Sequence, residues 1–124
     1  MLTLPSSVRI FIYSQPTDMR CGFNKLSMLA ETVMGQDVFS GHLFVFFNRY
    51  GDRCKILFWD GTGLWLWCKR LERGTFQRAA RRNDDIGCAL EVDVLTLTCI
   101  LEGIDLADAR RRTRYRRRMP RQAG

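Results

Sequence analysis

The sequence has no long apolar run and almost no histidine, and both shortages exclude functions. Its longest runs of apolar residues, 43–47 and 64–68, have five residues each, whereas a membrane-spanning helix needs roughly 20. The single histidine, His42, and five cysteines without a C-x-x-C pair do not make up a tetrahedral zinc set. We therefore predict no membrane span, no metal and no cofactor.

We also expect no secretory leader, because residues 1–7 lack a basic segment followed by a long apolar one. This indicates a cytoplasmic protein, in whose reducing environment we expect the five cysteines to be free thiols. The length of 124 residues predicts one domain, large enough to bury a core without disulfides.

Positive charge is scarce in most of the chain and concentrated near its C-terminal end. Residues 1–109 contain 12 basic and 13 acidic side chains, a net charge of −1, whereas residues 110–124 contain eight arginines and no acid. We predict a single domain over 1–109 and a flexible tail over 110–124. Such an arginine block is attracted to polyanions, which makes DNA the expected partner; a tail that only improves solubility is the alternative.

Hydrophobic patterning predicts an α+β fold, in which an antiparallel sheet of four to five strands is covered by one amphipathic helix. Segments rich in β-branched and aromatic residues predict strands over 8–13, 42–48, 53–59, 64–70 and 88–92. Turn residues at 49–52 and 60–63 join the middle three strands into an antiparallel meander.

Two helices complete the prediction. The first begins at Thr17 or Asp18 and ends at Gly35, because one face of it carries apolar residues at spacings of three and four. That face consists of Met19, Phe23, Leu26, Ala30 and Val33. The second is a short C-terminal helix over 94–102, with Asp93 as its N-cap.

Three ordered stretches resemble a known family: residues 17–23 (TDMRCGF), 39–46 (FSGHLFVF) and 51–61 (GDRCKILFWDG), which continues into 69–74 (KRLERG). They resemble the TnpB-type accessory proteins, products of the second open reading frame, of the IS66 family of bacterial insertion sequences. The resemblance extends over about residues 4–106. It implies a protein that assists transposition, with the separate, larger transposase and the element's other accessory protein as partners.

The residues themselves offer little for catalysis. A transposase needs carboxylates that hold two metal ions, and the candidates are Asp18, Asp52, Asp60 and Asp93. Two of these lie at predicted helix starts and two in predicted turns, where local backbone hydrogen bonds account for them. His42 and Cys54 across the first hairpin resemble a nucleophile pair, but they lack a third, orienting group. We predict that the protein is not an enzyme.

Basic and aromatic residues favour nucleic-acid binding. Strand alternation groups Lys55 with Trp59, and Trp65 with Trp67 and Lys69; we expect the two groups either to share an exposed face or to pack under the first helix. Other cations lie at strand ends, in the first helix and in the tail. The predicted contacts are Arg20, Arg49, Arg53, Lys55, Trp65, Trp67, Lys69, Arg70, Arg73, Arg110, Arg111, Arg112, Arg114, Arg116, Arg117 and Arg118.

We therefore predict a non-catalytic accessory protein that binds the DNA ends of an insertion sequence and helps assemble the transposase complex. The alternative is an adapter that docks on the transposase without contacting DNA.

Overall fold

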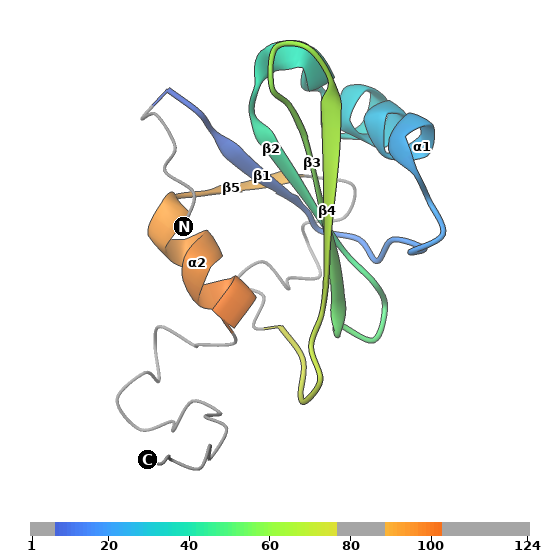
Figure 1. Ribbon diagram of the computed structural model, residues 1–124, viewed down its shortest axis with the longest axis vertical. Helices are drawn as coiled ribbons and strands as arrows, with labels where there is room; N and C mark the ends of the chain where they lie inside the picture. The colour runs from blue at the N-terminus through green and yellow to red at the C-terminus, as the bar shows by residue number, and fades with distance from the viewer. Residues whose placement is uncertain (1–6, 77–88, 103–124) are drawn as a thin grey trace.

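The computed structural model describes residues 7–76 and 89–102, which form one five-stranded sheet with helices on both of its faces (Figure 1). The strand order is β4-β3-β2-β1-β5. The α+β class is confirmed. The strands are β1 (Ile10–Tyr13), β2 (Leu43–Phe47), β3 (Arg53–Trp59), β4 (Leu64–Arg70) and β5 (Ala89–Val92). The helices are α1 (Phe23–Met28), the π-helix η1 (Leu29–Val33), the 3-10 helix η2 (Val38–Ser40) and α2 (Val94–Glu102).

The sheet is mixed, so the prediction of a purely antiparallel sheet is wrong at one pairing. β2, β3 and β4 form the predicted antiparallel meander, and β5 runs antiparallel to β1. β1, however, pairs parallel with β2, with Ile10 beside Leu43 and Ile12 beside Val45. A parallel pair needs a long crossover rather than a tight turn, and the segment with α1, η1 and η2 is that crossover.

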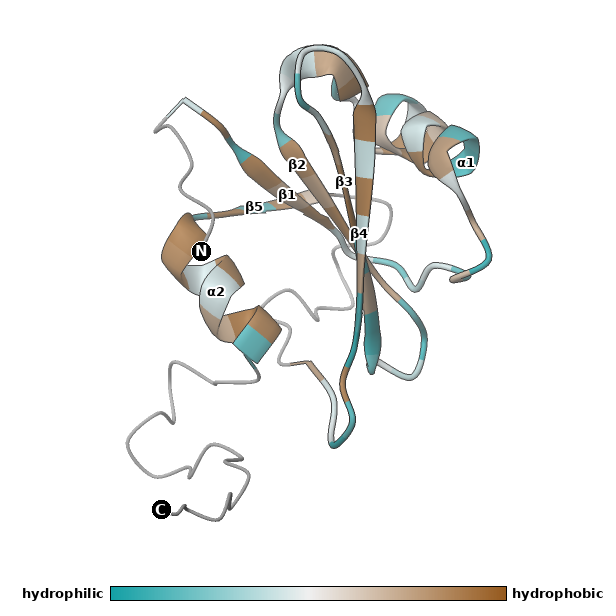
Figure 2. Ribbon diagram, in the orientation of Figure 1, coloured by the Kyte–Doolittle hydropathy of each residue, from teal (hydrophilic) through white to brown (hydrophobic). Residues whose placement is uncertain are grey.

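Each face of the sheet carries its own hydrophobic layer, and the five residues of β2 are all buried because both layers cover this central strand. On the α1 face the layer consists of Phe11, Leu26, Ala30, Met34, Val38, Phe44, Phe46 and Leu57. On the α2 face it consists of Ile10, Ile12, Leu43, Val45, Phe47, Cys54, Ile56, Phe76, Leu97 and Ile100. Figure 2 shows the apolar colouring along the strands between the two helices.

The first helix begins at Phe23, five or six residues later than predicted. Its N-cap is Gly22, and the Asp18 carboxylate instead accepts hydrogen bonds from the backbone and side chain of Arg20. The residues before the helix form an irregular segment, where the Thr17 N–H donates to the Phe47 carbonyl at 2.8 Å. The prediction that the helix begins at Thr17 or Asp18 is wrong, because a polar side chain that can cap a helix can equally close a local turn.

The buried stripe of that helix also differs from the prediction. Leu26 and Ala30 are buried as predicted, but Phe23 and Val33 are exposed by 45% and 37%, and Met34 is buried instead. Met34 replaces Val33 in the buried stripe because of the π-helical turn, in which the Met34 N–H bonds to the carbonyl of Leu29, five residues back. A π-turn contains more residues than an α-helical turn, so each residue rotates less about the helix axis. The buried positions, Leu26, Ala30 and Met34, are therefore four residues apart.

α2 agrees with the prediction over residues 94–102. Asp93 caps it, since its carboxylate accepts the Thr96 N–H at 2.8 Å and its carbonyl accepts the Leu97 N–H. At the other end of α2, the Lys69 ammonium donates to the Leu101 carbonyl at 2.8 Å. This bond ties the last turn of α2 to the C-terminal end of β4. The predicted helix stop at Gly103 lies outside the described residues.

Two further observations concern the described residues. Cys21, Cys54, Cys68 and Cys99 are free thiols, and Cys88 lies outside these residues. None of the helices in residues 7–76 and 89–102 has the length and apolarity to span a membrane.

Candidate nucleic-acid interface

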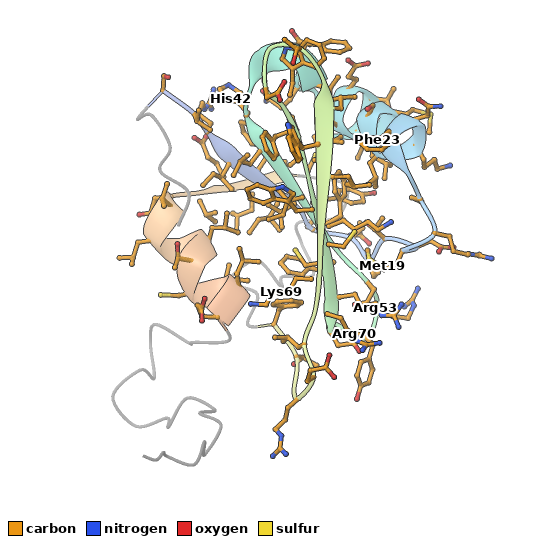
Figure 3. All side chains as sticks on the ribbon, viewed as in Figure 1. Met19, Phe23, His42, Arg53, Lys69 and Arg70 are labelled. Carbon is orange, nitrogen blue, oxygen red and sulfur yellow. The ribbon has the colours of Figure 1, made fainter. Side chains whose placement is uncertain are left out.

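Five cations gather at one end of the sheet, which we call the basic end: Arg49, Arg53, Lys69, Arg70 and Arg73. Arg49 lies in the β2–β3 turn and Arg53 is the first residue of β3, while the others lie at the C-terminal end of β4 and just after it. Figure 3 shows Arg53 and Arg70 together at this end, with Met19 nearby and Lys69 directed toward α2. The predicted strand-end clusters therefore lie side by side.

Arg53 and Arg70 are directly opposite each other in the β3–β4 ladder. Both are exposed, and like charges in such a pair destabilise a sheet. Glu72 compensates only Arg70, through a contact of 3.3 Å between Nη2 and Oε2. The ladder thus presents a local excess of positive charge that an anion would relieve.

The β2–β3 turn is built so that its two arginines stay at the surface. Asn48 organises it: the side-chain oxygen accepts the N–H groups of Gly51 and Arg53, and the side-chain amide donates to the Asp52 carboxylate at 2.8 Å. Gly51 has a φ of +85°, which glycine adopts without strain. Asp52 is therefore a turn residue, as predicted. Arg49 and Arg53 make no ion pair with any described residue.

Two open hollows meet at Arg53. One, of ≈ 550 Å³, is lined by Met19, Arg53, Cys54, Lys55, Cys68, Lys69, Arg70 and Glu72. The other, of ≈ 530 Å³, is lined by Pro16, Thr17, Asp18, Met19, Asn48, Arg49, Tyr50 and Arg53. Four of the eight residues around the first hollow are cations and one is an acid. This excess of positive charge favours an anionic ligand such as a phosphate group.

The opposite end of the sheet has acidic side chains. Asp60 occupies the β3–β4 turn, and Asp37 caps η2 by accepting the Phe39 N–H; Phe39 lies against Trp59 at the end of β3. The seven residues of β3 separate the two ends by roughly 20 Å. The sheet is therefore electrically polarised along its strands.

Besides Lys69 and Arg70, two more of the predicted cations have structural partners. The Lys55 ammonium donates to the Cys21 carbonyl at 2.9 Å and so holds the segment before α1 against β3. Arg20 pairs with Asp18 at 2.7 Å, and the guanidinium lowers the pKa of that carboxyl to about 2. Arg73 lies in the basic end. The tail arginines, from Arg110 to Arg118, lie outside the described residues.

The expectation of one surface shared by Lys55, Trp65, Trp67 and Lys69 is wrong. Cross-strand partners lie on the same face, and the register pairs Trp65 with Phe58, Trp67 with Ile56 and Lys69 with Cys54. The tryptophans therefore belong to the α2 face, whereas Lys55, paired with Cys68, belongs to the α1 face. Packing of these tryptophans under α1 is equally wrong.

Phe58, Trp65 and Trp67 form what we call the aromatic surface. Trp65 is 50% exposed and lies parallel to Phe58, with ring centroids 6.2 Å apart. Trp67 is 38% exposed and meets Phe58 edge-on at 5.0 Å. The Trp65 indole N–H donates to the Asp60 carboxylate, which fixes the ring in place. Sequence patterning did not find this bond.

Asp60 is the acceptor for the whole β3–β4 turn. The N–H of Thr62, the Trp65 indole and the N–H of Gly63 hold the pKa of Asp60 well below its usual range. Because the folded pKa is depressed, the stabilisation by Asp60 is complete above the unfolded pKa of about 3.9 and is lost as the pH falls through the folded pKa.

We expect the Trp65 indole N–H resonance to stay constant from neutral pH down to about pH 4 and to move only in stronger acid. Asp60→Ala should shift this resonance at neutral pH, whereas Asp37→Ala, which removes the other carboxylate at this end, should not. A titration of the Trp65 signal near pH 4 in the parent protein would contradict the bond to Asp60.

The structure does not bring together the groups that the sequence analysis considered for catalysis. His42 accepts the Arg9 N–H at 3.0 Å through Nδ1, and the register places Phe47, not His42, beside Cys54. Burial raises the pKa of the Cys54 thiol to about 12. Asp18, Asp52, Asp60 and Asp93 each bond to nearby backbone or side-chain groups. Across the described ranges, His, Cys, Asp and Glu do not form a group of three or more suited to a metal ion.

Comparison with known proteins identifies relatives for most of the chain. Residues 8–111 match the family model described as IS66 Orf2 like protein. A curated protein of Sinorhizobium fredii (strain NBRC 101917 / NGR234), "Uncharacterized protein y4hO", is 37% identical over 105 residues, which are 85% of this chain and 88% of the relative. "Uncharacterized protein y4jC" of the same strain is 39% identical over 69 residues, which are 56% and 59% of the two chains. No solved structure matches the chain significantly.

Proposed function

Since this chain belongs to the IS66 Orf2-like proteins, a family with an accessory role in insertion sequences, we propose that it binds DNA through its basic end and helps assemble the transposition complex. The role is non-catalytic. The DNA ends of the element are the proposed ligand, and the transposase with the element's other accessory protein are the proposed partners.

The observation that carries this proposal is the Arg53–Arg70 pair. Two like charges opposite each other in a ladder oppose folding unless an anion lies between or above them. DNA supplies a closely spaced row of phosphates, and guanidinium groups bind phosphate with two parallel hydrogen bonds. The hollows on both sides of Arg53 leave room for such contacts.

The position of α2 supports the same surface. Because Lys69 bonds to Leu101, the described chain ends beside the basic end at Glu102. The arginine block begins eight residues later, at Arg110, and eight residues of chain span at most about 28 Å. The tail arginines can thus reach the phosphates of a DNA segment that lies on the basic end.

The proposed contacts position the protein without reading sequence, because phosphates carry no base information. Trp65 and Trp67 are not part of this surface, since they lie on the α2 face while Arg53 and Arg70 lie on the α1 face. We therefore expect similar affinities for element ends and for other duplexes of the same length.

A double variant at the Arg53–Arg70 pair tests the proposal. We expect Arg53→Ala with Arg70→Ala to reduce the slope of log affinity against log salt by about 2, one for each lost phosphate contact. The control is Arg9→Ala with Lys25→Ala, which removes the same charge elsewhere and should leave the slope unchanged.

The thermal midpoint of the double variant separates lost binding from lost folding. We expect the midpoint to stay equal or rise, because the substitution removes a repulsion within the ladder. If DNA binding by the double variant equals that of the control, the basic end is not the DNA surface.

A further inference from the structure

The outer edge of β4 is the second feature that calls for a partner. Among the residues that the structure describes, β4 is a seven-residue edge strand with a continuous register from Leu64 to Arg70. The opposite edge strand, β5, has four residues. Natural proteins protect long edges with charges, proline or bulges, yet residues 65–68 of β4 have none of these.

The hydrogen-bond pattern shows which backbone groups this edge presents. Bonds from the Asp60 N–H to Gly63 and from the Leu71 N–H to Asp52 close the β3–β4 ladder at its two ends. Antiparallel ladders alternate between bonded and non-bonded pairs. The N–H and C=O groups of Leu64, Leu66, Cys68 and Arg70 therefore point outward. They form a regular row of donors and acceptors for an added strand.

We propose that β4 pairs antiparallel with β4 of a second copy of this chain, about a two-fold axis at Trp67. In this register Leu66 of each copy exchanges hydrogen bonds with Cys68 of the other. The outward-pointing N–H and C=O groups of the two strands therefore bond to each other. Trp67 faces Trp67 of the second copy as a non-bonded pair, the closer of the two pair types. The patch is self-complementary, as a two-fold interface requires.

Strand overlap selects this register. An axis at Trp67 pairs all seven residues of β4 with those of the second copy, whereas an axis at Leu66 pairs only residues 64–68. Trp65 of one copy then lies beside Lys69 of the other, and Leu64 beside Arg70. Because the pairing is antiparallel, the acidic end of one copy lies beside the basic end of the other.

This inference goes beyond the proposed function and does not rest on it. Pairing of β4 uses the edge of the sheet and the aromatic surface, while Arg49 and Arg53 stay exposed at the β2–β3 turn. The dimer presents two basic ends at opposite ends of the paired strands. A failure of DNA binding would leave the dimer unaffected.

Sedimentation of the full chain under reducing conditions tests the dimer. We expect the parent to show a concentration-dependent monomer–dimer equilibrium in the micromolar range. Cys68→Pro removes an outward N–H without removing a bond to β3, so this variant should be monomeric at the same concentrations. Cys68→Ser keeps the N–H and should dimerise like the parent. A far-ultraviolet spectrum and a thermal midpoint verify that each variant is folded.

Trp67→Lys gives an independent test, because it places like charges opposite each other across the axis. We expect the dissociation constant of the dimer to rise by roughly a hundredfold. A parent that stays monomeric throughout the micromolar range would overturn the proposal, as would undiminished dimerisation of the proline or lysine variant. A monomeric parent whose transposase binding is lost in Cys68→Pro would assign the edge to another protein and equally overturn it.

Discussion

Replacing Leu26 by alanine is expected to lower the free energy of unfolding by about 2–5 kcal/mol. Leu26 is fully buried in the layer between α1 and the sheet, with Phe44, Phe46 and Leu57. Shortening it removes apolar burial and leaves a cavity that the surrounding strands cannot fill completely. A small domain has only about 5–15 kcal/mol of stability, so this single change consumes a large part of it.

Phe23→Ala is the matched control, on the same helix and one turn earlier. The ring is 45% exposed, so we expect a loss of less than about 1 kcal/mol. Equilibrium denaturation in urea measures both variants. Equal losses would contradict the observed rotation of the helix, and a larger loss for Phe23→Ala would support the stripe predicted from sequence periodicity.

Deleting residues 110–124 is expected to have the largest effect on DNA binding. If all eight arginines contact phosphates, the deletion lowers the slope of log affinity against log salt by about 7, through the loss of counterion release. The thermal midpoint should change little, because residues 1–109 carry a net charge of −1 and are predicted to fold without the tail.

The same deletion separates the two functions under consideration. An adapter that docks on the transposase keeps that interaction without the tail, whereas a DNA-binding protein loses most of its affinity for duplex DNA. A truncated protein with the parent's affinity and salt slope would show that the tail only improves solubility. The basic end would then have to account for the binding alone.

Local patterns predicted much of the fold. The ranges 53–59, 64–70 and 94–102 agree with β3, β4 and α2 residue for residue, because each is bounded by turn or capping residues such as Asp60 and Asp93. The parallel β1–β2 pair was not predictable in this way. Strand direction depends on how the crossover passes over the sheet, which alternation along one strand does not report.

The sequence predicted where the candidate site lies along the strands, but not on which face of the sheet each residue lies. The cations at the strand ends were expected at turns, and the meander brings them together. The face of Lys55 was misassigned because the connection pairs Trp59 with Leu64, so odd numbers in β3 face even numbers in β4. The Asp60-Gly-Thr-Gly63 turn contains that information, since a two-residue tip fixes the register.

The sequence predicted Asp60 as a turn residue, but it did not identify Asn48 or the bond between Asp60 and the Trp65 ring. Asn48 holds the β2–β3 turn and Asp60 holds both the β3–β4 turn and the Trp65 ring. Their signal was an Asn or Asp just before a glycine-containing turn, which is typical of an Asx-turn. Such a signal predicts the local turn, but not a bond to an indole five residues away.

The most direct test of DNA binding is the affinity of the full-length protein for duplex DNA, measured between 50 and 200 mM salt on an element end and on an unrelated duplex. With six or more phosphate contacts, we predict a fall of roughly 10³–10⁵ in affinity over this range, similar for both duplexes. Absence of binding at the low-salt end, or an affinity that does not depend on salt, would contradict the proposal.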